Sequence, residues 1–258
     1  MLESLLERTV DAGYVVLPGA FGAAEVQALR DGVEAAAGRA VDLAATADPG
    51  AVSTTVNRQG HRLQTVHGTA LHSTSIHWEP GTERPTVRNL RPVTHLDPRL
   101  DALWADPRLT EPAATLLGVP DVAPLTSKIS FKRARVGSEY IWHQDYGFLA
   151  RFLGTTARAA VTAMVLLDDA DAGNGALWLV PRSHRGGPRP DYEGPGPDDA
   201  TPVRIDAPAG TVVAFPTLMV HRSDPNHSDR DRRALLLLYQ PAGRPHLNET
   251  QQHTPPPH

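Results

Sequence analysis

The N-terminal part of the chain carries apolar residues at helical spacing. We expect a short helix over residues 3–12, followed by an apolar run over 14–17 that ends at a Pro-Gly turn. A second helix is expected over 23–37, because apolar residues recur there every three or four positions: Val26, Leu29, Val33 and Ala36. Residues 100–117 fit a third helix, ended by a glycine. Residues 40–95 show no sustained period, so we expect loops and short elements there, arranged as a lid.

From residue 124 onwards the pattern changes to that of short β-strands. Apolar and polar residues alternate or form short buried runs, separated by turn signals rich in Gly, Asn, Asp and Pro. The expected strands cover residues 125–131, 140–146, 159–167, 176–180, 211–215 and 234–239. Helices followed by several short strands predict a mainly β fold, a sandwich or jelly roll buttressed by N-terminal helices.

A length of 258 residues fits one domain of this kind. Within it we expect a helical buttress with lid loops over 1–120, the jelly-roll core over 121–240, and a disordered tail over 241–258. The Pro- and Gly-rich stretch 186–202 is expected to form a surface loop.

The composition narrows the possible chemistry and partners. No cysteine is present, so any metal must be held by histidines and carboxylates. The net charge is −4 with both signs interspersed, which favours neither a nucleic acid nor an anionic membrane as partner. The N-terminus lacks the pattern of a signal peptide, and no apolar run approaches the length of a membrane span. We therefore expect a cytoplasmic protein that acts on a small molecule, as a monomer or homodimer.

One short segment combines an imidazole and a carboxylate among aromatic residues. In Tyr140-Ile-Trp-His-Gln-Asp-Tyr-Gly-Phe148, an extended backbone would put His143 and Asp145 on one face, with Cα atoms roughly 6.6 Å apart. His221, which ends a later apolar run, is the best candidate for a third ligand. Two histidines and one carboxylate are the ligand set of non-haem Fe(II) oxygenases. Each of the three alone is equally compatible with a structural role.

The segment leaves two further points open. His184 and His227 are alternative third ligands if His221 is not one. If the strand is extended throughout, the aromatic residues alternate away from the ligands and pack behind them: Tyr140, Trp142, Tyr146 and Phe148.

An arginine follows His221 eleven residues later, at the start of a strongly apolar run. The planar guanidinium of Arg232 suits a carboxylate, and a dicarboxylate cosubstrate would satisfy it. A surface network is the alternative, because three acidic residues lie nearby in the sequence: Asp224, Asp229 and Asp231. The chain contains only two lysines, Lys128 and Lys132, both shortly before His143. Chance explains this clustering as readily as a need for a compact, mobile charge does.

Together these motifs resemble the phytanoyl-CoA dioxygenase family of Fe(II)/2-oxoglutarate oxygenases, particularly the bacterial branch of ectoine and free amino-acid hydroxylases. The segments that carry the resemblance are 13–19, 127–132, 142–145, 174–184 and 221–238. One departure is Arg182, which stands where the family's turn motif has a glycine.

The resemblance implies a double-stranded β-helix core and the cofactors Fe(II), 2-oxoglutarate and O2. It implies His143, Asp145 and His221 as iron ligands and Arg232 as the partner of the distal 2-oxoglutarate carboxylate. Hydroxyl contacts to the cosubstrate are implied for Thr162, Ser223 and, with less support, Ser130. Lys128 falls where relatives contact substrate or cosubstrate, and it shares a strand face with Lys132, so substrate contact is expected from this pair.

The implied reaction is hydroxylation of an unactivated C–H bond of a small metabolite, in bacterial secondary metabolism. A carboxylate at Asp145 favours hydroxylation over halogenation, because halogenating relatives have a small residue there. Oxidative cyclisation, epimerisation or desaturation of a sugar- or polyketide-derived product stays open, as does a non-catalytic jelly-roll binding module. Residues 146–151 differ from the acidic, Trp-containing continuation of ectoine hydroxylases, which disfavours ectoine as substrate.

Overall fold

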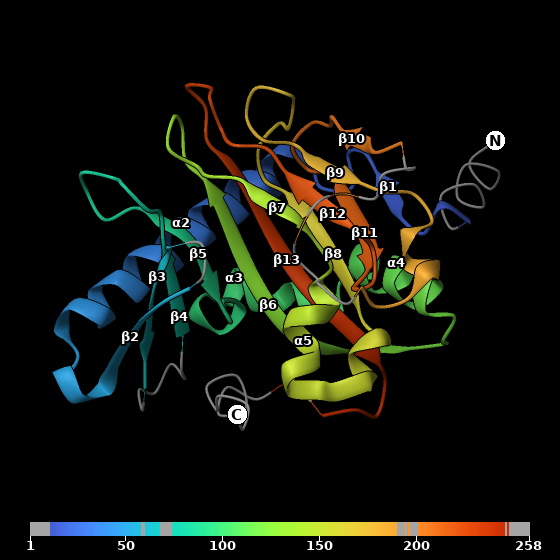
Figure 1. Ribbon diagram of the computed structural model, residues 1–258, viewed down its shortest axis with the longest axis horizontal. Coiled ribbons are helices and arrows are strands. Elements are labelled where there is room, and N and C mark those ends of the chain that lie inside the picture. The colour runs from blue at the N-terminus through green and yellow to red at the C-terminus, as the bar shows by residue number, and fades with distance from the viewer. Residues whose placement is uncertain are drawn as a thin grey trace.

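The computed structural model describes residues 11–57, 60–67, 74–189, 194, 196, 201–245 and 247. Two antiparallel sheets dominate this part of the chain (Figure 1). The larger sheet has the order β1-β11-β8-β13-β6-β5-β4-β3-β2 and the smaller β10-β9-β12-β7. The larger sheet consists of β1 (Val15–Leu17), β2 (Val52–Val56), β3 (Arg62–Val66), β4 (Thr74–Trp78), β5 (Val87–Arg91), β6 (Val122–Lys132), β8 (Val161–Leu166), β11 (Val212–Pro216) and β13 (Arg232–Pro241). The smaller consists of β7 (Tyr140–His143), β9 (Leu177–Leu179), β10 (Val203–Ile205) and β12 (His221–Ser223).

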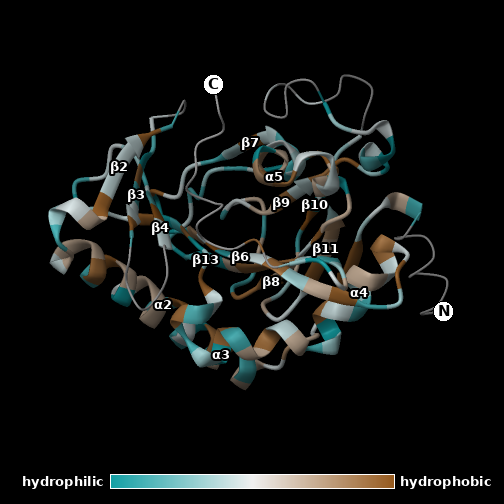
Figure 2. Cartoon of the chain, turned by 90° about the horizontal axis from the view of Figure 1, so that it is seen from below, coloured by the Kyte–Doolittle hydropathy of each residue, from teal (hydrophilic) through white to brown (hydrophobic). Residues whose placement is uncertain are grey.

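Helices cover one face of the larger sheet (Figure 2). They are α2 (Ala23–Thr46), α3 (Pro98–Asp101) and α4 (Pro107–Leu117). The apolar face expected for α2 is buried, and the helix runs past residue 37 because the following stretch is rich in alanine, the strongest helix former. A fourth helix, α5 (Asp145–Leu153), lies on the opposite side of the sheet, beside β7 (Figure 2).

Alternation along β8 explains how one strand serves two apolar layers. Val161, Ala163 and Val165 pack in the cluster shared with the helices. Met164 and Leu166 point the other way, into a cluster that also holds residues of β9, β10 and β11. The larger sheet is therefore buried on both faces at its centre, with the smaller sheet on the side away from α2, α3 and α4. This two-sheet architecture confirms the expected mainly β, jelly-roll class.

The short elements expected over 40–95 are present, but the expectation that they form a loop-rich lid was wrong. β2, β3, β4 and β5 form an antiparallel meander that extends the larger sheet. Its strands are rich in Thr, Ser and Gln as well as apolar residues, so their alternation has little hydrophobic contrast. Pairing with β6 through Asn89–Ser130 and Leu90–Ile129 supplies the missing stability, and a pattern within one strand does not reveal such long-range pairing.

Other boundaries also differ. The helix expected over 100–117 is interrupted: α3 ends at Asp101, and α4 begins at Pro107 after the N-cap Asp106. The short strands β10 and β12 were not expected. The helix expected over 3–12 and the tail expected over 241–258 lie mostly outside the described residues. Of that tail, residues 241–245 and Leu247 are described, and Leu247 packs in a small apolar cluster with Leu125 and Leu149.

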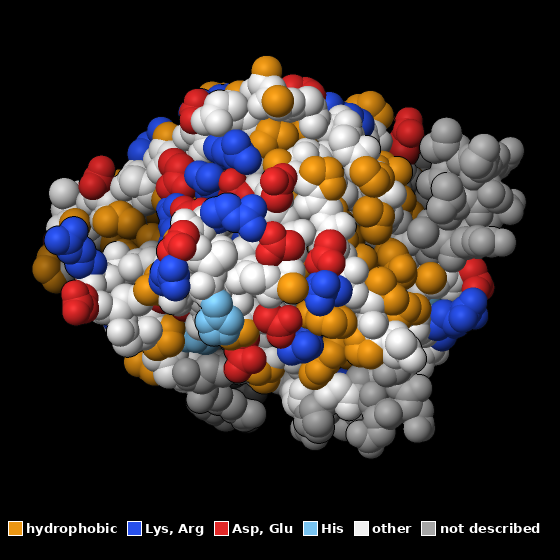
Figure 3. Space-filling model, turned by 90° about the horizontal axis from the view of Figure 1, so that it is seen from above, with side chains coloured by type: hydrophobic (Ala, Val, Ile, Leu, Met, Phe, Trp, Pro, Cys, Tyr) orange, Lys and Arg blue, Asp and Glu red, His pale blue; other side chains and the backbone are white. Residues whose placement is uncertain are grey.

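Charge is mixed on the molecular surface, as the interspersed sequence pattern indicates. On the face drawn in Figure 3, basic and acidic side chains stand next to one another and between apolar ones. Among the described residues, none of the helices combines the length and the apolar character that crossing a bilayer requires.

Candidate metal centre

Strand pairing brings two distant histidines together. β12 lies antiparallel to β7, and His221 is the direct cross-strand partner of His143. Residues paired in this way project from the same face of the sheet. The imidazole rings are 4.1 Å apart between centroids, and the ring of Phe215 lies 4.9 Å from that of His221. The smaller sheet thus brings into contact two histidines that are 78 positions apart in the sequence.

Asp145 reaches the same point by a different route from the expected one. The strand does not continue through residue 145: β7 ends at His143, Gln144 is the N-cap, and Asp145 is the first residue of α5. Gln144 is fully buried, and its side chain donates to the carbonyl groups of Gly187 and Leu218. This anchoring fixes the bend that turns the Asp145 carboxylate towards the histidines.

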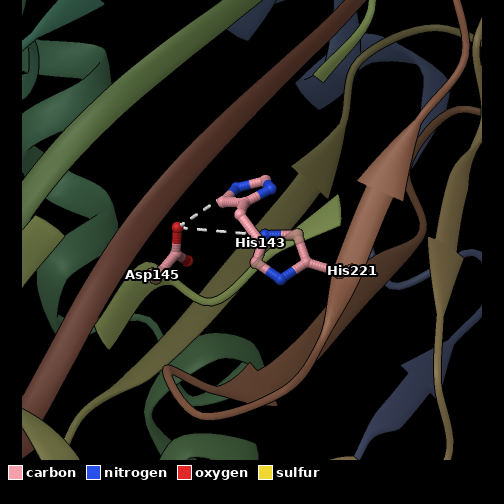
Figure 4. Close-up of side chains that lie close together, drawn as sticks. All are labelled: His143, Asp145 and His221. Atoms are coloured by element: carbon pink, nitrogen blue, oxygen red, sulfur yellow. Dashed lines mark ion pairs between the residues drawn. The ribbon is translucent and has the colours of Figure 1, made fainter. Parts of the chain in front are cut away.

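The three side chains form a compact ligand cluster (Figure 4). Asp145 Oδ1 lies 3.8 Å from His143 Nε2 and 3.8 Å from His221 Nε2. One ligand atom from each residue lies within 4.8 Å of the other two. Two imidazole nitrogens and one carboxylate on one side of a point leave the other positions around a metal ion open.

Backbone hydrogen bonds set the tautomer of both imidazoles. His143 Nδ1 lies 2.7 Å from the carbonyl oxygen of Ile141, and His221 Nδ1 lies 2.9 Å from that of Met219. A carbonyl only accepts, so each Nδ1 carries the proton and each Nε2 presents its lone pair to the cluster. Burial and the neighbouring His221 hold the pKa of His143 well below its ordinary value, which keeps this imidazole in the neutral, metal-binding form.

Thr162 supports the carboxylate ligand. Its Oγ1 donates to Asp145 Oδ2 over 2.9 Å, from a fully buried position on β8. Thr162 is absent from the residues that line the two described cavities at this site. The Thr162 hydroxyl thus orients Asp145 and leaves Oδ1 to face the histidines, while its expected contact to a cosubstrate stays a prediction.

Arg232 is buried next to the cluster, and no acidic residue in the described part of the chain pairs with it. It is 4% exposed and lines a narrow cavity together with His143, Asp145 and His221. One of its guanidinium nitrogens donates to the carbonyl oxygen of Gly175 over 2.5 Å, while the buried Nε has no partner. Burial lowers the pKa of Arg232 to about 10, so the group is still charged at neutral pH. A buried cation in this state is costly unless it meets an anion.

The acidic residues considered as alternative partners of Arg232 are engaged elsewhere. Asp224 pairs with Arg222, Asp229 with Arg135 and Asp231 with Arg133. No carboxylate among the described residues forms an ion pair with Arg232. Its neighbour Arg233 faces the other side of β13, as strand alternation predicts, and pairs there with Asp168 and Glu34.

Polar groups line the same narrow cavity. Ser130 and Ser223, both expected to contact the cosubstrate, are among its lining residues. Lys128 and Tyr140 line this cavity and a larger neighbouring one, and Lys128 Nζ lies 4.6 Å from the centre of the Tyr140 ring. Burial alone would raise the pKa of Tyr140, but the charges of Lys128 and Arg88 lower it to about 8.

The expectation for Lys132 was wrong. Its side chain is fully buried, and Nζ donates to the carbonyl groups of Ser138 and Asp224 over 2.8 and 2.6 Å. Lys132 lines neither of the two cavities. The two lysines share a strand face, but the carbonyl groups that surround Lys132 make it a structural cation.

The aromatic residues also differ from expectation. Because Asp145 starts a helix, Tyr146 and Phe148 lie on α5 rather than on an extended strand. Tyr140 and Phe148 line the larger cavity together with His143 and Asp145, rather than packing behind these ligands. His184 and His227, the alternative third ligands, are outside the metal-ligand cluster found among the described residues.

A larger cavity of about 610 Å³ lies beside the ligands, walled by β4, β5, β6, β7 and α5. Sequence reasoning missed the residues that β4 and β5 contribute to it, including His77, Asn89 and Arg91. The only sequence signal was the cluster of histidines between residues 61 and 95, which has no period that assigns it to a strand.

Comparison with known proteins places these observations in context. The chain is 32% identical over 160 residues to L-proline trans-4-hydroxylase of Streptomyces griseoviridis, covering 52% of this chain and 59% of that protein. The crystal structure of EctD from S. alaskensis with 2-oxoglutarate and 5-hydroxyectoine superposes with a TM-score of 0.64 at 24% identity, covering 96% and 82% of the two chains. The carbocyclase SnoK from nogalamycin biosynthesis gives 0.67 at 19% identity, covering 98% and 91%.

The family model for phytanoyl-CoA dioxygenase (PhyH) matches residues 10–234. This range contains the two sheets up to the beginning of β13, the three clustered ligands and Arg232. The match confirms the expected resemblance. The chain belongs to the phytanoyl-CoA dioxygenase family.

Proposed function

We propose that the protein is an Fe(II)- and 2-oxoglutarate-dependent dioxygenase that oxidises, most simply by hydroxylation, a C–H bond of a small-molecule metabolite. One observation carries this proposal. A buried guanidinium without an anionic partner and a two-histidine, one-carboxylate cluster line the same narrow cavity. The cluster fits iron by the type and number of its ligands, and Arg232 fits the free carboxylate of a dicarboxylate.

Each residue of the site has a defined task in this proposal. His143, Asp145 and His221 would hold the iron, with Thr162 fixing the carboxylate and two backbone carbonyls fixing the imidazoles. Arg232 would bind the distal carboxylate of 2-oxoglutarate, assisted by the hydroxyl groups of Ser130 and Ser223. When bound, iron and 2-oxoglutarate supply the oxidising power that removes hydrogen from the substrate.

The protein's own contribution is to position these groups and to exclude water. Met164, Leu177, Phe215 and Leu236 line the narrow cavity and give it an apolar wall. The substrate would occupy the larger cavity, because the two cavities share His143 and Asp145 in their linings. A substrate held in this way presents one particular C–H bond to the metal centre, so the shape of the cavity decides which bond reacts.

Asp145 bears on the type of reaction. With all three ligands supplied by the protein, no halide-sized gap is left in the ligand set, which supports hydroxylation over halogenation. SnoK, a carbocyclase, supports the view that this fold also accommodates ring closure. A setting in bacterial secondary metabolism is proposed by analogy with that protein.

The test is iron-dependent conversion of 2-oxoglutarate to succinate, measured with and without candidate substrates. We expect succinate with Fe(II) and none in the His221→Ala variant, whose circular dichroism spectrum should match that of the wild type. Arg232→Ala should raise the KM for 2-oxoglutarate by at least about tenfold, the loss of one charge-assisted contact. A protein that binds neither Fe(II) nor 2-oxoglutarate would instead be a non-catalytic jelly-roll binding module.

A further inference from the structure

The larger cavity contains two buried polar atoms without partners. Among the described residues, neither His77 Nε2 nor Asn89 Oδ1 finds a hydrogen-bond partner, and both residues line the cavity. Asn89 is 3% exposed, so its side chain is largely shielded from bulk solvent. Buried polar atoms in native proteins are nearly always hydrogen-bonded, and two orphans in one cavity wall indicate a ligand that supplies the missing bonds.

The backbone places these two atoms side by side. His77 on β4 is the direct cross-strand partner of Asn89 on β5. The register shifts immediately after His77, between that residue and Trp78. Such irregularities re-aim a side chain out of the regular alternation. The two orphaned groups therefore form one pair on the cavity wall.

The hydrogen bond that Asn89 already makes indicates which kind of ligand group the His77–Asn89 pair can bind. Its Nδ2 donates to the hydroxyl of Tyr140 over 3.2 Å, so Oδ1 is the atom left to accept from a ligand. A carboxylate has no hydrogen to donate to this oxygen. The ligand group must carry an O–H or an N–H.

Charge separates these two possibilities. Burial and the positive charges of Arg91, Lys128 and Arg88 hold the pKa of His77 well below its usual range, so the imidazole is neutral at pH 7. The same three cations and Arg151 line the cavity, with Arg88 paired to the buried Glu79, and the lining acids are the exposed Glu139 and the candidate metal ligand Asp145. An ammonium group would be repelled by this wall, whereas a neutral hydroxyl would not.

We propose that His77 and Asn89 form a hydroxyl-binding subsite that anchors an uncharged, hydroxyl-bearing carbon skeleton, such as a sugar or cyclic alcohol, beside the metal ligands. Its hydroxyl donates to Asn89 Oδ1 and exchanges a second hydrogen bond with His77 Nε2. Apolar side chains of the same cavity contact the carbon skeleton: Leu63, Phe148, Leu149, Leu236 and Leu238. The subsite selects against an ammonium group at this position, because that group would meet the positive charges of the wall. This assignment names the substrate class of the proposed dioxygenase and rests on that proposal for its catalytic meaning.

The subsite is tested with small probes on the full chain, without iron or 2-oxoglutarate. Cyclohexanol and methoxycyclohexane have the same ring, but only cyclohexanol has a hydrogen to donate. Their dissociation constants are measured by ligand-observed NMR, together with that of cyclohexylamine at pH 7. We expect cyclohexanol to bind roughly tenfold more tightly than methoxycyclohexane, the effect of one to two hydrogen bonds in a buried site.

Substitutions assign this preference to the two residues. His77→Phe and Asn89→Leu should each remove most of the tenfold preference, while His77→Gln, which keeps a polar group at similar reach, should retain part of it. None of these three substitutions should weaken the binding of cyclohexylamine. Phe148→Leu is the matched control in the same cavity, and it should weaken cyclohexanol and methoxycyclohexane equally. If Asn89→Leu does not fold, the comparison of His77→Phe with His77→Gln decides.

The proposal is overturned if cyclohexanol does not bind, binds no better than methoxycyclohexane, or binds equally well to wild type and His77→Phe. None of these measurements requires iron, so their failure leaves the dioxygenase proposal standing. Conversely, absence of iron-dependent succinate formation would refute the dioxygenase proposal without affecting the probe results.

Discussion

Thr162→Val isolates the hydrogen bond that orients the carboxylate ligand. Valine has nearly the same shape as threonine, so the fully buried site on β8 stays filled while the donor to Asp145 Oδ2 is lost. Groups that hydrogen-bond to a metal ligand typically contribute 10- to 100-fold to metal affinity, about 1.4 to 2.7 kcal/mol. Oδ2 would lose its donor, and the carboxylate would rotate more freely about its bond to Cβ.

The assay is an anaerobic Fe(II) titration of wild type, Thr162→Val and Thr162→Ser, followed by measurement of the KM for 2-oxoglutarate. We expect Thr162→Val to bind Fe(II) at least about tenfold more weakly, and Thr162→Ser, which keeps the hydroxyl, to remain near wild type. The KM for 2-oxoglutarate at saturating iron should change little. Unaltered Fe(II) affinity together with a raised KM would refute this reasoning and return Thr162 to the cosubstrate contact expected from sequence.

Three further substitutions test the surrounding structure. Gly175→Ala should lower the free energy of unfolding by more than about 1 kcal/mol and raise the KM for 2-oxoglutarate. The reason is that, at φ +81°, an added Cβ would lie 2.4 Å from the carbonyl oxygen of Asp224. A variant with wild-type urea unfolding and wild-type KM would contradict this. Arg182 has φ 63°, so Arg182→Gly should be more stable than Arg182→Ala by about 1 kcal/mol in the same urea assay, and equal stability would show that no strain is present. Hydrogen bonds, mainly from Arg99, hold the pKa of Asp97 below 3.8. Asp97→Asn should therefore lower the free energy of unfolding by roughly 1 to 2 kcal/mol at pH 7, and the difference from wild type should shrink as the pH falls below 3.8. A difference that is independent of pH would disprove the charge effect.

The residues of the candidate metal centre could be predicted from the sequence, but their geometry could not. The order of His143, Asp145 and His221 and the position of Arg232 carry a family resemblance, and the structure brings all four to one cavity. The bend at Gln144 was not predictable, because it depends on buried hydrogen bonds to Gly187 and Leu218, more than 40 positions away. A local pattern of alternating residues contains no information on such contacts.

The substrate side of the site was even less accessible to sequence reasoning. β5 pairs with β6 and β4 pairs with β5, so both strands depend on long-range pairing, and their polar residues give no strand-like alternation. His77 and Asn89 therefore appeared as members of a loop region. Lys132 shows the opposite error: its rarity suggested function, whereas two backbone carbonyls engage its ammonium group.

The convergence of three side chains on one iron is tested most directly by anaerobic Fe(II) titration of the wild-type chain and of His143→Ala, Asp145→Ala and His221→Ala, with circular dichroism to verify folding. The account predicts one tightly bound Fe(II) per wild-type chain and at least a hundredfold weaker binding in each variant, since each loses a direct metal ligand. Wild-type affinity in a folded His221→Ala variant would contradict it.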